Sequence, residues 1–199
     1  VTFNETGLTA STTYFYDIFA YNGTTGTYNY LTTSPLEGSK STLAIEPTAQ
    51  PTALTFSGTQ PTSMTLTWIA ATSSPAGYIV LRKTVSSPTE VPVDGTSYTA
   101  GNTIGTSTVV YVGSDITFNE ASLTVGATYY YAIFSYNGTT GTFSYLTTGP
   151  LENNQVAGSS FTAEPTAQPT ELIFSNVQPT TMTLSWTAAS GSPDGYIAL

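Results

Sequence analysis

Leu123-Thr-Val-Gly-Ala-Thr-Tyr-Tyr-Tyr-Ala-Ile-Phe-Ser-Tyr-Asn-Gly-Thr-Thr-Gly-Thr142 carries the strongest structural signal in this chain. Leu123 is followed six residues later by Tyr129, and aromatic and apolar residues then alternate as far as an Asn-Gly turn at Asn137. Alternation of this kind predicts a strand, and Asn-Gly predicts a tight reversal into the next strand. We therefore expect a strand that enters a buried corner, crosses a sheet and turns into its neighbour.

The same pattern occurs once more, between Leu8 and Thr27, where Tyr14 stands six residues after the leucine and Asn22-Gly23 supplies the turn. Residues 1–36 align without a gap on residues 116–151, with 24 identities in 36. Repetition over so long a stretch indicates a tandem array of modules.

A second pair of segments repeats with a different offset. Residues 46–81 align without a gap on residues 164–199, with 25 identities in 36. The sequence therefore predicts the C-terminal part of one module with its linker (1–45), one complete module with its linker (46–163) and the N-terminal part of a third (164–199). Because Val1 falls in the middle of a module, we expect the natural N-terminus to lie upstream.

Composition favours an all-β protein with a packed core. Apolar residues make up 39% of the chain and charged residues only 8%, against roughly 25% charged in an average soluble protein. Threonine accounts for about a fifth of the residues, and β-branched and aromatic residues favour strands. No Glu/Lys/Leu/Ala pattern of helical period is present.

The charge balance excludes two classes of partner. Twelve acids stand against three bases, Lys40, Arg82 and Lys83, for a net charge of -9. Phosphate backbones and anionic lipids both require a basic patch, so we expect no nucleic-acid binding and no docking on anionic membranes. No apolar run approaches the ~20 residues that span a bilayer, so no membrane insertion is expected in this segment. The acidity itself is explained by the solubility of a surface rich in Thr, Ser, Gly and Asn.

The complete module is expected to hold about seven strands separated by turn signals, which is typical of a β-sandwich. A proline-containing segment, Glu46 to Thr52, reads as a stiff extended linker. The segments Glu37 to Ser41 and Glu152 to Ser160 are expected to be more flexible than this linker. The expected strands centre on Leu54–Phe56, Met64–Trp68, Gly77–Arg82, Thr108–Val112, Phe118–Leu123, Tyr129–Tyr136 and Phe143–Leu146.

Three features resemble the fibronectin type III module, and the resemblance extends over the whole chain. They are a tryptophan in the second strand, a Gly-Tyr-Ile opening of the third and a Leu-x5-Tyr corner before the sixth. In the corner, a tyrosine ring fills the end of the sandwich and its hydroxyl can bond to upstream backbone. The structural residues predicted on this basis are Trp68, Trp186, Leu8, Tyr14, Leu123 and Tyr129.

The chain also departs from that family. Its repeat of 118 residues exceeds the roughly 100 of a typical sandwich of this class, and the excess lies between Arg82 and Val109. The Arg-Gly-Asp loop of animal integrin-binding modules is missing, so that function is not carried over. Asp94-Gly-Thr-x-Tyr98 and Val110-Tyr-Val-Gly113 are similar to modules in long secreted proteins of Bacteroidota, which include adhesins of gliding cells and multidomain secreted enzymes.

Few residues point to chemistry. The chain has no histidine and no cysteine, so Ser-His-Asp and Cys-His arrangements, thiolate metal sites and disulfides are excluded, and no cofactor is expected. Arg82 and Lys83 could clamp an anion or simply end a strand in solvent. The recurring acids Glu5/Glu120, Glu37/Glu152 and Glu46/Glu164 read as strand-edge or linker residues, without the ligand pattern of a calcium loop. Asn4, Asn22 and Asn137 match the N-glycosylation pattern, although turns already explain the last two.

One stripe of rings invites a binding hypothesis. If Tyr129, Tyr131 and Ile133 face the core, alternate residues face outward, where rings could stack on sugars or meet a neighbouring module. The alternative is that the long segment 84–107 folds over them. These candidate contact residues are Tyr130, Phe134, Tyr136, Phe15, Phe19 and Tyr21.

Two functions are consistent with these observations. The first is a non-catalytic structural repeat in the stalk or fibre of a long extracellular adhesin or filament, with partners among neighbouring modules and laterally associated copies. The second is a carbohydrate-binding or spacer module of a secreted multidomain polysaccharide-degrading enzyme, with surface glycans as partners. Both place the chain outside the cell.

Overall fold

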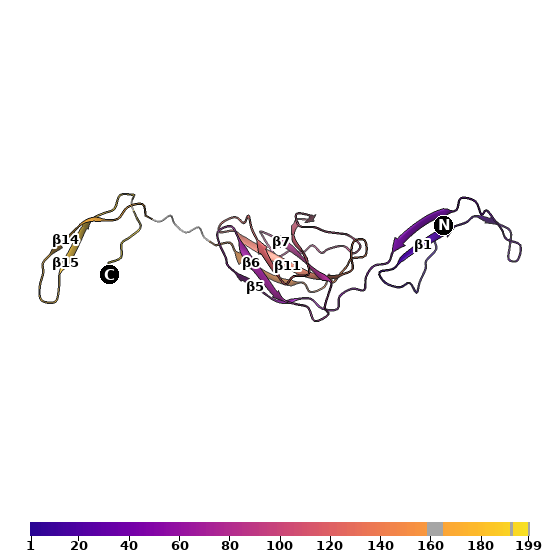
Figure 1. The fold of residues 1–199 in the computed structure, drawn as a ribbon, viewed down its shortest axis with the longest axis horizontal. Helices are drawn as coiled ribbons and strands as arrows, with labels where there is room; N and C mark the ends of the chain where they lie inside the picture. Colours follow the sequence, from indigo (N-terminus) through magenta and orange to yellow (C-terminus); the bar gives the residue numbers. More distant parts are fainter. Residues whose placement is uncertain (159–164, 192, 199) are drawn as a thin grey trace. The chain divides into compact units, whose positions relative to one another are not determined.

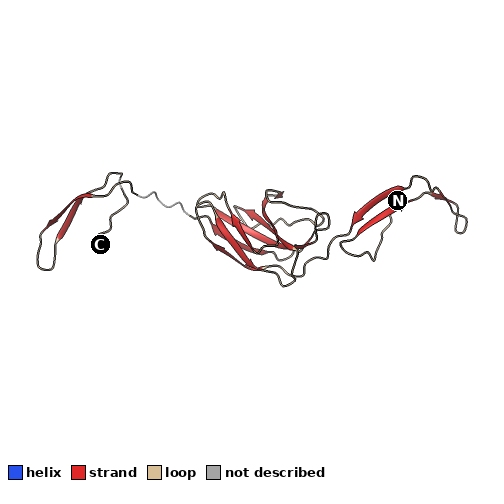
Figure 2. Cartoon of the chain, in the orientation of Figure 1, coloured by secondary structure: helices blue, strands red, loops and turns tan. Residues whose placement is uncertain are grey.

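The computed structural model describes residues 1–158, 165–191 and 193–198, and the regular elements of these residues are all β-strands (Figures 1 and 2). The predicted all-β fold class is confirmed. Among the described residues there is no helix of the length and apolarity that a membrane span requires. The strands are β1 Thr13–Ile18, β2 Tyr21–Asn22, β3 Asn29–Tyr30, β4 Leu36–Ser41, β5 Thr52–Ser57, β6 Met64–Ile69, β7 Gly77–Lys83, β8 Thr103–Ile104, β9 Ser107–Gly113, β10 Thr117–Glu120, β11 Thr128–Asn137, β12 Ser144–Tyr145, β13 Leu151–Val156, β14 Thr170–Ser175 and β15 Thr183–Thr187.

Contacts divide the chain into two compact units, Val1–Ser159 and Ser160–Leu199. The boundary that the sequence predicts after residue 45 falls inside the first of these units and stays a prediction. Residues 44 and 45 are hydrogen-bonded to the module, through the backbone N–H of Ala44 and the carbonyl of Ile45.

The complete module is a sandwich of two antiparallel sheets. One sheet has the strand order β10-β6-β5, and the other has the order β12-β11-β7-β9-β8 with β13 added to β11. Alternation in β6 explains its place in the core, because Met64, Leu66 and Trp68 are buried while Thr65 and Thr67 face away. These three side chains pack against Tyr131 and Ile133 of β11 in one core cluster.

The second sheet has a covered outer face as well. The central residues of β11, from Tyr131 to Tyr136, are all buried. Ile79, Leu81, Val109, Ala132 and Phe134 form a second apolar cluster on that outer face, joined by rings from residues 98 and 143. The excess length between Arg82 and Val109 thus forms a third layer, which accounts for the size of the repeat.

Two strands lie where the sequence predicts soft linkers. β13 pairs with β11 from Val156 to Leu151, and β4 pairs with β1 over six residues in the N-terminal part. The expectation of soft segments at 37–41 and 152–156 is wrong, because an edge strand needs only backbone hydrogen bonds and these residues have no apolar alternation to reveal them. Residues 159 and 160 lie outside the described part of the chain.

The repeated segments keep the same backbone. β5 and β14 each carry a register irregularity against the next strand, at Thr52/Thr55 and Thr170/Ile173. A residue with positive φ lies inside each bulge, Ala53 at 55° and Glu171 at 58°. Left-handed backbone is unfavourable for residues with a Cβ, so its recurrence shows that the bulge is built into the repeat.

Candidate functional site

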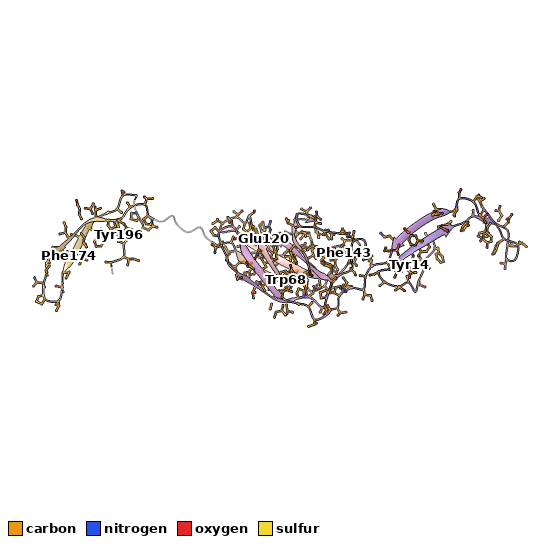
Figure 3. All side chains as sticks on the ribbon, in the orientation of Figure 1. Tyr14, Trp68, Glu120, Phe143, Phe174 and Tyr196 are labelled. Atoms are coloured by element: carbon orange, nitrogen blue, oxygen red, sulfur yellow. The ribbon has the colours of Figure 1, made fainter. Side chains whose placement is uncertain are left out.

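Trp68, labelled in Figure 3, is one of the buried residues of the inner core. Its side chain is 2% exposed and meets the rings of Tyr78 and Tyr111 edge-on, with centroids 5.7 and 6.0 Å away. The Tyr78 hydroxyl accepts a hydrogen bond from the backbone N–H of Ala71 at 2.9 Å. In the C-terminal unit Trp186 meets Tyr196 in the same way at 5.7 Å, but Trp186 is 39% exposed.

The tyrosine corner is present in both copies. The backbone N–H of Thr124 donates to the Tyr129 hydroxyl at 2.8 Å, and that of Thr9 donates to the Tyr14 hydroxyl at 2.8 Å. Leu123 and Tyr129 are both buried. The corner closes one end of the sandwich, where Ala127 also bonds to the outgoing chain at Ala157.

The outward rings of the complete module are covered. Phe134 and Tyr136 are 1% and 8% exposed, so the hypothesis that they form a surface contact is wrong for this module. Tyr136 packs on Tyr145 with ring centroids 5.8 Å apart, and Tyr145 packs in turn on Tyr98 at 5.9 Å. Tyr98 belongs to residues 84–107, which we call the covering segment. Tyr130 is half-buried.

Hydrogen bonds fasten the covering segment. Asp94 Oδ1 accepts from the backbone N–H of Tyr145 at 2.8 Å, and the Tyr145 hydroxyl donates to the Thr96 carbonyl at 2.9 Å. In the N-terminal part, the rings at the equivalent places stay exposed: Phe15, Phe19 and Tyr21.

A buried acid lies between the sheets. Glu120 is 3% exposed, pairs with Arg82 and accepts a hydrogen bond from the Tyr131 hydroxyl at 2.5 Å. Burial raises the pKa of Glu120, and the Tyr131 hydrogen bond and the Arg82 charge oppose that shift. The N-terminal copy repeats the contact, since the Tyr16 hydroxyl donates to Glu5 at 2.6 Å.

Sequence reasoning missed this acid by assigning it to a strand edge. Phe118 and Glu120 are two residues apart in β10 and therefore share a face. Phe118 packs against the core, so the spacing itself indicates an inward-pointing carboxylate. The same pairing removes Arg82 from the candidate anion clamp.

Lys83 also forms an ion pair: its Nζ lies 3.3 Å from Oε1 of Glu90 in the covering segment. Glu90 accepts further hydrogen bonds from the Thr106 and Ser107 hydroxyls at 2.6 and 2.7 Å. These two bonds hold the pKa of Glu90 well below its ordinary value. The arrangement ties the start of the covering segment to the strand that follows it, which is a structural role.

The acidic residues considered as calcium ligands do not form a cluster. Glu37, Glu46 and Glu152 are exposed, and Glu164 lies outside the described residues. In the described part of the chain, no three His, Cys, Asp or Glu residues lie close enough to hold a metal ion. Asn137, one of the glycosylation candidates, has both ends of its amide engaged: Nδ2 donates to the Ile45 carbonyl at 2.9 Å, and Oδ1 accepts from the Ala76 N–H at 3.0 Å.

The incoming chain is fastened at one end of β11. Besides the bond from Asn137, the N–H of Ala44 donates to the Thr142 carbonyl at 2.8 Å. Gln50 then bridges two segments, accepting from the Ser135 N–H at 2.8 Å and donating to the Leu146 carbonyl at 2.6 Å. The linker motif is therefore part of the module that follows it.

The outgoing chain is fastened at the other end of β11. The N–H of Ala157 donates to the Ala127 carbonyl at 2.9 Å, and the N–H of Gly158 donates to the Gln60 carbonyl at 3.1 Å. A Cβ at Gly158 would lie 3.3 Å from the carbonyl oxygens of Thr59 and Gln60, so the close passage of the chain favours glycine here.

The sequence matches no protein-family model and no curated protein. Among solved structures, the chain is similar to a redesigned β-sandwich protein, with 18% identity and a TM-score of 0.40 over 55% of this chain and 95% of that chain. A fibronectin type III domain of a human protein has 15% identity and a TM-score of 0.39, over 60% of this chain and 79% of that chain. Domains d3–d4 of the rat CD45 extracellular region have 15% identity and a TM-score of 0.31, over 77% and 70%.

Proposed function

We propose that the repeat is a non-catalytic structural module, a rigid unit in the stalk or fibre of a long extracellular adhesin or filament of the kind found in Bacteroidota. The observation that carries this proposal is the position of the two linkers. The incoming chain is bonded to Asn137, the last residue of the ten-residue strand β11, and the outgoing chain to Ala127, the residue just before its first. At about 3.3 Å per residue, the strand separates these attachments by roughly 30 Å.

Attachment at opposite ends suits a module that transmits tension. A force applied through the linkers acts along β11, which is paired on both sides, with β7 and with β13. The linker motif recurs in the sequence at Glu46 and Glu164. We expect the same attachment in successive modules, whose stability is then a sum of module and interface terms.

The charged side chains support a structural rather than a catalytic role. Arg82 and Lys83 are each paired with an acid, Glu120 and Glu90. The alternative of a carbohydrate-binding module has less support, because the rings of Phe134 and Tyr136, which would stack on a sugar, lie beneath the covering segment.

Small-angle scattering on arrays of two, three and four repeats tests the proposal. We expect the maximum dimension to grow by one constant increment per repeat, since each junction is fastened by side-chain and backbone bonds. Asn137→Ala in every repeat removes the bond to the incoming chain and is expected to reduce that increment, whereas Thr140→Ala, an exposed change in the same turn, should not. Growth as the square root of the number of repeats, the behaviour of a flexible chain, contradicts the stalk.

A further inference from the structure

The attachment of the incoming chain to the module depends on the side-chain amide of Asn137, the last residue of β11. Its Nδ2 donates to the Ile45 carbonyl at 2.9 Å, and its Oδ1 accepts from the Ala76 N–H at 3.0 Å. One half of the amide therefore binds the incoming chain, and the other half binds the loop before β7, which belongs to the module itself.

The residue after Asn137 is a glycine, and the turn requires it. Gly138 has a φ of +96°, in a range that residues with a Cβ rarely adopt. A Cβ at Gly138 would also lie 2.5 Å from the Thr142 carbonyl oxygen and 3.0 Å from the Cβ of Ala44. The turn and the incoming chain thus both favour an Asn-Gly pair at this point.

An Asn-Gly pair loses its side-chain amide more readily than other asparagine dipeptides, because glycine has no side chain to hinder its own nitrogen. In this reaction the Gly138 nitrogen bonds to Cγ of Asn137, the Cγ–Nδ2 bond breaks, and Nδ2 leaves as ammonia with the proton of the Gly138 nitrogen. Water then opens the cyclic succinimide to aspartate or isoaspartate. The reaction therefore needs only water and these two residues.

The folded junction holds the amide away from this reaction. Asn137 is paired with Ser144 at the end of the β11–β12 ladder, and ring closure would turn its backbone out of the extended range of a strand. Ring closure also swings the side chain toward Gly138, so the bonds to Ile45 and Ala76 have to break first. Detachment of the incoming chain removes one of these two bonds and leaves Nδ2 without that acceptor.

The product would lose one of the two hydrogen bonds and keep the other. A carboxylate at position 137 still accepts from the Ala76 N–H, but an ionised carboxylate has no hydrogen to donate to the Ile45 carbonyl. Two oxygens would then face each other, so the bond to the incoming chain is replaced by repulsion. Isoaspartate also carries a carboxylate, and it lengthens the backbone of the turn by a methylene group.

We propose that Asn137-Gly138 is a deamidation site under the control of the incoming chain. The amide is protected while it binds Ile45. Once the chain detaches, the amide is lost, and the product does not bind the chain again. A junction that has opened for long enough thus becomes permanently open. The proposal concerns the chemistry of the junction and does not rest on the stalk function.

Peptide mass spectrometry of the full chain, incubated at slightly alkaline pH, tests the protection. Asn137 is expected to react at least roughly tenfold more slowly in the folded chain than in concentrated urea, because two ordinary hydrogen bonds have to break first. Asn22 begins the same hexapeptide, Asn-Gly-Thr-Thr-Gly-Thr, and should match Asn137 in urea. Equal rates at Asn137 in the folded and the urea-unfolded chain overturn the proposal.

Two variants of the incoming chain test its control over the reaction. Ala44→Pro removes the N–H that donates to the Thr142 carbonyl at 2.8 Å, next to the Ile45 bond, and should raise the rate at Asn137 roughly fivefold. Ile45→Ala is the control, because it shortens a side chain that is 74% exposed and keeps the carbonyl; its rate should equal that of the wild type. A folded Ala44→Pro protein that reacts no faster than the wild type contradicts the proposal.

The Asn137→Asp variant tests the effect of the product without any change in the incoming chain. Hydrogen exchange of the Ala44 amide measures the attachment, and it should be roughly fivefold faster in this variant than in the wild type. Asn154→Asp adds the same charge at an exposed residue of β13 and should leave the exchange unchanged. Aged wild-type protein should show the faster exchange in proportion to its deamidated fraction. Unchanged exchange in Asn137→Asp or in the aged protein overturns the proposal.

Discussion

The ring of Trp68 fills the space between the two sheets, and its loss is expected to be costly. Trp68→Ala should reduce the free energy of unfolding by ~3–5 kcal/mol, the usual cost of removing a large core side chain. Chemical denaturation of the full chain, followed by tyrosine fluorescence, measures the change. Trp186→Ala is the matched control, because the same residue type is 39% exposed there; an equal loss for both variants would contradict the assignment of Trp68 to the core.

The buried Glu120 makes a second prediction, on pH. Its folded-state pKa is raised above the ordinary 4.5, mainly by burial. A raised carboxyl pKa means that the folded state binds the proton more tightly than the unfolded state, so the contribution to stability is present below pH 4.5 and is lost as the pH rises through the folded-state pKa.

Melting curves of the wild type and of Glu120→Gln between pH 4.5 and 8 measure this effect. The melting temperature of the wild type should fall, relative to that of the glutamine variant, as the pH rises through the window. Curves that run parallel, or a wild type that gains stability with pH relative to the variant, would show that the Arg82 charge outweighs burial at this site.

At the scale of the elements, Gln50 attaches the linker to the sheet. Gln50→Ala leaves the backbone N–H of Ser135, a buried residue, without the acceptor it now has, which costs about 1–3 kcal/mol. Gln60→Ala, at an exposed residue, is the control and should change stability by less than about 0.5 kcal/mol. Equal effects of the two changes, measured by urea denaturation, would mean that the linker is only loosely attached.

The strands that the sequence predicts are those with a side-chain signal. In β6, apolar residues alternate with threonines. In β11, residues that face the inner core alternate with residues on the opposite face of the sheet. This period of two predicts the place of both strands in the sandwich. β4 and β13 are edge strands held by their backbone and lack such alternation, so the sequence predicts linkers there. The sequence alone does not place the covering segment, since the prolines and turns in residues 84–107 do not say which surface they cover.

The candidate site was predictable only in part, for a related reason. The tyrosine corners depend on local spacing, and Thr124 and Tyr129 are five residues apart. The environment of Glu120 depends instead on Arg82, from another strand, at a separation of 38 residues. A single sequence does not show such long-range pairings, although the shared face of Phe118 and Glu120 indicates the inward direction of the acid.

At the scale of the whole molecule, the claim is that each repeat is an independent unit under load. The incoming and outgoing linkers are attached at opposite ends of β11, and the core of the complete module lies within one repeat. Tension on an array should therefore unfold modules one at a time instead of stretching a continuous flexible chain.

Single-molecule pulling on an array of repeats tests this claim most directly. The repeat length is 118 residues, the offset between Glu46 and Glu164, and an extended chain spans at most ~3.3–3.6 Å per residue. The account predicts a series of equal unfolding steps, each releasing roughly 350–400 Å of chain once the folded length is subtracted. Extension without resolved steps, or steps much shorter than one repeat, would contradict it.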